Sequence, residues 1–127
     1  MPEELDLTPA RAVAMAQDLI DAGRPFHAHE VFEAAWKTAP ADERNLWQGL
    51  AQLAVGLTHA RRGNGRGAVT LLRRGATAIG GYGAAWPHGI EVSGARAAAN
   101  QLADQIERSG LESIPATDLR LQLAAGR

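Results

Sequence analysis

The amino-acid sequence predicts an all-α fold, a compact bundle of about five helices with a partly extended C-terminal arm. Apolar residues recur every three to four positions through most of the chain, as they do on the buried face of a helix. No segment alternates polar and apolar residues in the manner of a half-buried strand. Glycines and prolines interrupt the helical pattern at short intervals, which predicts short connections between neighbouring helices.

The first two predicted helices begin at prolines. Thr8 precedes Pro9, and this pair suits a helix start because threonine caps well and proline has no N–H to leave unpaired. Gly23 is expected to end the first helix, since glycine readily adopts the left-handed backbone of a helix end. The second helix is expected over about 25–37, and it must end before Pro40.

Three more helices are expected, separated by a Gly-Asn-Gly turn at 63–65 and a glycine-rich loop at 80–89. They span about 42–62, 67–79 and 93–108, with Asp42 and Ser93 as the N-caps of the third and fifth. Beyond them, Leu111, Ile114 and Leu119 predict an arm laid across the bundle. Pro115 is expected to keep part of this arm extended.

Length, charge and cysteine content limit the class of protein. The 127 residues predict a single helical domain over 1–127, with enough buried surface for its own core. Thirteen basic and fourteen acidic residues leave a net charge of -1, so no overall field attracts nucleic acid or an anionic membrane. No apolar run is long enough to span a bilayer. The absence of cysteine excludes disulfides and thiolate metal sites, and we expect a cytoplasmic protein.

The second predicted helix places polar residues on the face that should meet the core. At about 100° per residue, His29 and Glu33 lie among the large aromatics Phe26, Phe32 and Trp36. Trp36 is therefore expected to be largely buried. A charge on such a face costs free energy unless it is paired or hydrogen-bonded. Because His29 and Glu33 are four residues apart, they are close enough to interact directly.

A second polar stripe follows the third predicted helix. Gln48, Gln52, Val55 and His59 recur at steps of four, three and four, so they share one face. Gln48 alone fits a solvent-facing position. Glycine and leucine at the other margins indicate that this helix is covered on more than one side, so Gln52 and His59 are expected to face the stripe of the preceding helix. Histidines, glutamates and a glutamine on adjacent helices are similar in kind to a metal site inside a bundle.

Three runs of this sequence resemble a known family. HAHEVFEAAW, QGLAQLAVGLTHARRGNGRGAVTLLRRG and PHGIEV together resemble the small helical family described as domain of unknown function 309, over about 26–92. The family pattern falls on His29, Glu30, Glu33, Trp36, Gln48, Gly49, Gln52, His59, Gly63, Asn64, Gly67 and Ala68. The resemblance implies an all-helical fold and brings the label of a predicted metal-dependent hydrolase. Glu91 departs from the pattern, because an aspartate is commoner there.

Two functional hypotheses stay open. In the first, the chain is a metal-assisted hydrolase with a divalent metal and a polar pocket between helices. His29, Glu33 and His59 would then be the metal ligands, Glu30 the general base on bound water, and Gln52, Gln48 and Trp36 the binding residues.

In the second hypothesis, the chain is a non-catalytic protein- or peptide-binding helical module. Residues 47–79 resemble one tetratricopeptide-type hairpin, although no repeat at that period is found elsewhere. The polar cluster would then be a structural brace, in which Glu33 orients His29 and both bond neighbouring helices. The sequence leaves the small molecule or peptide partner open, as well as the choice between monomer and homodimer.

Overall fold

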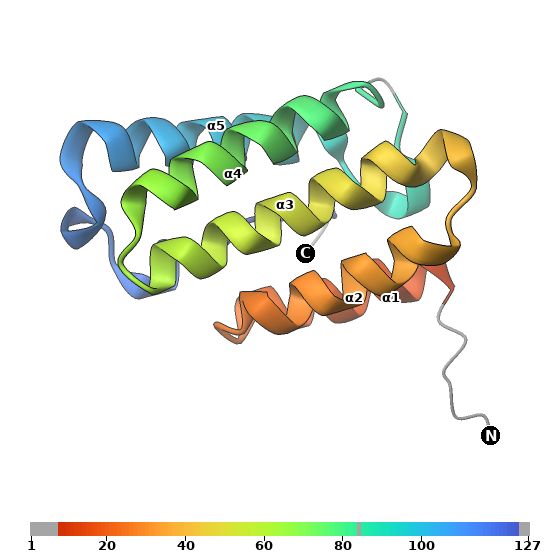
Figure 1. Ribbon diagram of the computed structural model, residues 1–127, viewed down its shortest axis with the longest axis horizontal. Coiled ribbons are helices and arrows are strands. Elements are labelled where there is room, and N and C mark those ends of the chain that lie inside the picture. Colours follow the sequence, from red (N-terminus) through yellow and green to blue (C-terminus); the bar gives the residue numbers. More distant parts are fainter. Residues whose placement is uncertain (1–7, 84, 125–127) are drawn as a thin grey trace.

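The computed structural model describes residues 8–83 and 85–124, which form five α-helices (Figure 1). These are α1 (Pro9–Asp21), α2 (Pro25–Thr38), α3 (Arg44–Arg61), α4 (Gly65–Gly80) and α5 (Val92–Ser109). Short 3-10 helices are η1 (Ala41–Glu43), η2 (Pro87–Gly89), η3 (Leu111–Ser113) and η4 (Ala116–Asp118). The predicted all-α bundle with a C-terminal arm is confirmed. None of the described helices combines the length and the apolarity needed to cross a membrane.

Consecutive helices pack against one another, each running back along the one before it (Figure 1). In Figure 1, α2, α3 and α4 form a front layer, with α1 behind α2 and α5 behind α4. The segment that follows α5 returns behind α3 toward α1. α3 is therefore flanked by α2 and α4 and covered from behind, which leaves one outer stripe of this helix toward solvent.

Helix ends follow the local sequence, with two corrections. The Thr8 hydroxyl accepts a hydrogen bond from the N–H of Arg11 at 3.2 Å, which confirms the predicted first cap. Asp42 does not cap α3, because it lies inside η1 and Glu43 occupies the position before the helix. Ser93 does not cap α5 either: it lies in the first turn, and its hydroxyl donates to the Gly83 carbonyl.

α3 and α4 approach closely because glycines lie between them. A Cβ added at Gly49 would come within 2.8 Å of both Ala78 Cβ and Ile79 Cγ2. A Cβ added at Gly75 would come within 2.7 Å of the Leu53 side chain. Real Cβ atoms are not found so near other heavy atoms, so any larger residue at either position would force the two helices apart. Gly49 of the Gln-Gly-x-x-Gln run is thus a packing residue.

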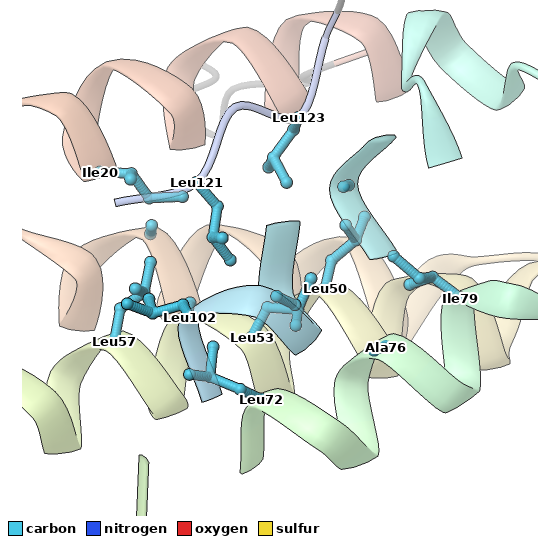
Figure 2. Packing of buried hydrophobic residues seen from close by; sticks show 14 of the residues in the cluster. Ile20, Leu50, Leu53, Leu57, Leu72, Ala76, Ile79, Leu102, Leu121 and Leu123 are labelled. Atoms are coloured by element: carbon cyan, nitrogen blue, oxygen red, sulfur yellow. The ribbon is translucent and has the colours of Figure 1, made fainter. Parts of the chain in front are cut away.

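The core is centred on the inner face of α3. Leu50, Leu53 and Leu57 are all buried there, and Figure 2 shows them surrounded by side chains from α1, α4 and α5. Leu121 and Leu123 point from the C-terminal arm into the same cluster. The arm is therefore part of the core and not a surface appendage.

A buried glutamine holds this arm in place. The side-chain amide of Gln17, fully buried in α1, donates to the Leu121 carbonyl at 2.9 Å and accepts from the N–H of Leu123 at 2.7 Å. Its nitrogen also donates to Asp21 at 3.0 Å. On the other side of the arm, the N–H of Glu91 donates to the Leu123 carbonyl at 2.8 Å. Gln17 thus satisfies backbone groups that a neighbouring strand would otherwise satisfy.

Replacing Gln17 by alanine should destabilise the protein by roughly 2–4 kcal/mol. The reason is that the carbonyl of Leu121 and the N–H of Leu123 would lose their partner, and each buried unsatisfied group costs about 1–3 kcal/mol. Urea denaturation followed by circular dichroism measures the change. Gln105→Ala, at an exposed position of α5, is the matched control and should stay within about 0.5 kcal/mol of the parent. Equal stability of the two variants would contradict the role given to Gln17.

Candidate functional site

The aromatic residues of α2 do not share the core as the sequence predicted. Phe32 is buried with 1% of its surface exposed, whereas Phe26 is 43% exposed. Trp36 is partly buried and packs against the core, so of the three aromatics Phe26 departs most from the predicted burial. The buried face of α2 is centred on Ala28 and Phe32, and Trp36 and His29 lie at its margin. The positions of the large aromatics predicted a buried face that is rotated about the helix axis from the observed one. The observed face includes Ala28, whose small side chain contributes little to a hydrophobic pattern.

His29 and Glu33 lie together at this margin. The distance from His29 Nε2 to Glu33 Oε1 is 3.9 Å, with side-chain exposures of 21% and 50%. The other ring nitrogen, His29 Nδ1, is buried and has no hydrogen-bond partner within residues 8–83 and 85–124. Among the described residues, neither side chain bonds a neighbouring helix. The pair therefore lacks the interhelical bonds that a structural brace requires.

His59 takes part in a cap between α3 and α4. The Asn64 side chain accepts from the N–H of Gly67 at 2.9 Å, which fixes the orientation of its amide. The amide nitrogen of Asn64 then lies 3.2 Å from His59 Nδ1, and since an amide nitrogen only donates, Nδ1 accepts. The ring therefore carries its proton on Nε2 when it is neutral. A Cβ at Gly67 would lie 2.6 Å from this amide nitrogen, so His59, Asn64 and Gly67 form one structural unit.

The two glutamines line an open groove between α3 and α4. Gln48 is exposed and Gln52 is half-buried. With Arg74 and Thr77 of α4, they line a hollow of about 640 Å³. Glu30, the predicted general base, is exposed on α2.

The predicted metal ligands do not assemble. His29 and Glu33 pair with each other, whereas His59 Nδ1 is occupied by Asn64. Within residues 8–83 and 85–124, no three histidine, aspartate or glutamate side chains are grouped closely enough to hold a metal ion. The side chains in these positions thus do not fit a three-ligand site, which needs converging donors.

Two cation–π contacts instead align α2 with α3. The Arg44 guanidinium lies 4.4 Å from the centroid of the Trp36 ring, and that of Arg62 lies 5.8 Å from the Phe26 ring. Because these contacts join opposite ends of the two helices, the stripes between them run side by side. We call this surface the outer seam. It comprises Phe26, His29, Glu33 and Trp36 of α2, Arg44, Gln48, Gln52, Val55 and His59 of α3, and Arg62 directly after α3.

A second polar cluster, at the start of α3, was not predicted. His88 Nε2 lies 2.9 Å from Glu43 Oε1, and Trp47 Nε1 donates to the same oxygen at 3.2 Å. The His88 and Trp47 rings stack with centroids 5.6 Å apart. His88 has a φ of 55°, a left-handed conformation that is uncommon for residues other than glycine. Because 45 residues separate His88 from Glu43, no local spacing pairs them.

Hydrogen bonding sets the charge of this cluster. The bond from His88 lowers the pKa of Glu43 from its ordinary value, the bond from Trp47 adds to that effect, and burial opposes it. Glu43 is therefore a carboxylate at neutral pH. A carboxylate only accepts, so His88 Nε2 must donate in this pair.

One family of known proteins matches part of this chain. The family model described as "Domain of unknown function (DUF309)" matches residues 13–71. The predicted family resemblance is confirmed. The matched segment includes α2, α3 and therefore the whole outer seam, whereas His88 lies beyond it.

A curated relative of the chain is the uncharacterized protein YpuF of Bacillus subtilis (strain 168). The two are 46% identical over 48 residues, which make up 37% of this chain and 28% of YpuF. The chain thus matches less than a third of the length of that relative. No solved structure matches the chain significantly.

The stability that Glu43 contributes should depend on pH. Its pKa in the folded state lies below the ordinary value of 4.5, so its contribution is present at neutral pH and is lost as the pH falls through the folded-state pKa. We expect Glu43→Gln to be less stable than the parent by about 1 kcal/mol at neutral pH, because its amide oxygen can still accept from Trp47 and His88 but these bonds lose the contribution of the charge. Urea denaturation across a pH series should show this difference shrinking in acid. A difference that stays constant from neutral to acidic pH would contradict the assignment.

Proposed function

We propose that the chain is a non-catalytic protein- or peptide-binding helical module, and that the outer seam is its binding surface. The observation that carries the proposal is the pairing of Phe26 and Trp36, both partly exposed, with Arg62 and Arg44. Aromatic residues and arginine are enriched where binding energy is concentrated in protein interfaces. Two such pairs at the ends of one seam provide two anchoring points for an extended partner.

The middle of the seam offers polar groups suited to a peptide. Gln48 and Gln52 have amides that both donate and accept, and they line the open groove beside α4. Peptide backbone presents the same two kinds of group at every residue, apart from proline. Gln48, Gln52 and Trp36 therefore keep the binding role that the sequence predicted for them, with a peptide in place of a small substrate.

The geometry favours this function over metal-assisted hydrolysis. Hydrolysis of that kind needs a metal-bound water for Glu30 to activate, and that water needs converging ligands. Within the described part of the chain such a ligand group is absent. Side chains of the seam are partly or fully exposed along two helices, which suits contact with a partner surface better than enclosure of a reacting bond.

Selection of peptides against the intact chain tests the proposal. Peptides selected from a displayed random library on the parent protein should lose about tenfold or more in affinity for Trp36→Ala, as expected for an aromatic hot spot. Trp86→Ala is the matched control, because Trp86 is 58% exposed in the loop before η2 and lies outside the seam. Its affinity should stay within about twofold of the parent. Circular dichroism checks that both variants remain folded.

Two outcomes would contradict the proposal. One is that the selected peptides bind Trp36→Ala and Phe26→Ala as well as they bind the parent. The other is a melting temperature that rises with zinc or manganese concentration in the parent but not in His29→Ala, since that response belongs to the metal-dependent alternative.

A further inference from the structure

A cavity separate from the outer seam lies where α2 ends and α3 begins. It has a volume of about 420 Å³, within the range of about 300–1,000 Å³ typical of small-molecule sites. Its walls are mostly apolar and include Ala12 of α1 and Val31 and Ala35 of α2. Glu43 and Trp47 close it on the side of α3.

Glu43 places a carboxylate in this wall, and one of its two oxygens can accept further hydrogen bonds. Trp47 and His88 both bond its Oε1 atom, and no described residue bonds Oε2. Arg44, next in sequence, lies over the Trp36 ring instead. Among the described residues, His88 is the one residue that forms an ion pair with Glu43. The cavity therefore combines an apolar wall with a carboxylate whose Oε2 takes no hydrogen bond from the part of the chain that the structure describes.

We infer that this cavity binds a small organic cation with an apolar body, an alkyl- or aryl-ammonium. The ammonium group would donate to Glu43 Oε2, and the apolar body would lie against Val31, Ala35 and Ala12. A hydrogen bond between two charged groups is about twice as strong as a neutral one. Apolar surroundings strengthen it further, because they lower the local dielectric. A neutral ligand of the same shape gains the apolar contact but not the charge pairing.

His88 is a positioning residue in this site. Its left-handed backbone places the ring against Trp47, from where Nε2 reaches Glu43. Strained backbone of this kind persists where the surrounding structure holds it, and it is concentrated at functional sites. By occupying Oε1 together with Trp47, His88 directs the charge of the carboxylate to Oε2.

Titration with a matched pair of probes tests the inference. Phenethylammonium and 2-phenylethanol have the same ring and chain and differ in the charged group. The readout is the indole N–H resonance of Trp47 in a nitrogen–proton NMR spectrum, because that N–H bonds Glu43. Phenethylammonium should shift this resonance saturably at millimolar concentration, and the alcohol should bind about tenfold more weakly or worse.

Three variants separate the site from a general charge effect. Glu43→Gln should abolish the preference for the ammonium, whereas Asp42→Asn, which removes an exposed neighbouring carboxylate, should retain it. Ala35→Leu should fill the cavity and weaken both probes while the carboxylate remains. Equal affinity of the two probes for the parent, or an unchanged preference in Glu43→Gln, would overturn the inference. So would the absence of a saturable shift in the parent.

Discussion

α4 lies against α3 where Gly75 faces Leu53 and where Gly49 faces Ala78 and Ile79. With no Cβ at either glycine, the two helices come close enough for the leucines of α3 to fill the space between α4, α5 and the arm. This contact sets which side of α3 is buried. The one stripe left toward solvent carries Gln48, Gln52 and His59, so the polar surface of the molecule depends on a packing contact on the adjacent face.

The position of α3 in turn determines which side chains α2 leaves exposed. α2 buries Ala28 and Phe32 and leaves Trp36 and Phe26 at its edge. Arg44 of α3 covers the Trp36 ring, and Arg62, directly after α3, covers the Phe26 ring. Binding is proposed at this edge because it combines partly exposed aromatics with arginine. The cavity beside Glu43 lies where the same two helices meet, but its walls are different side chains, and the ligand inferred for it is a small organic cation.

Most of the fold followed from the sequence, because prolines and glycines mark the helix ends locally. The cap formed by Asn64 also rests on residues only a few positions apart, which makes such a device recognisable in a sequence. The orientation of α2 was not predicted correctly, because the positions of its large aromatics do not coincide with its buried face. Ala28 is completely buried, whereas Trp36 is only partly buried. Glu43 and His88 were missed for another reason: their contact depends on where the loop before α5 returns, and local propensity does not encode that path.

The stability of Gly75→Ala, compared with that of Gly81→Ala, tests the central contact most directly. A Cβ at Gly75 would overlap Leu53, so this variant should lose about 1–3 kcal/mol in urea denaturation, the usual cost of overpacking. A Cβ at Gly81 would meet nothing nearer than 3.9 Å on an ordinary helical backbone, so Gly81→Ala should be neutral or gain up to about 1 kcal/mol. If Gly75→Ala were as stable as Gly81→Ala, α3 and α4 would not meet as closely as described, and the surfaces derived from their contact would lose their basis.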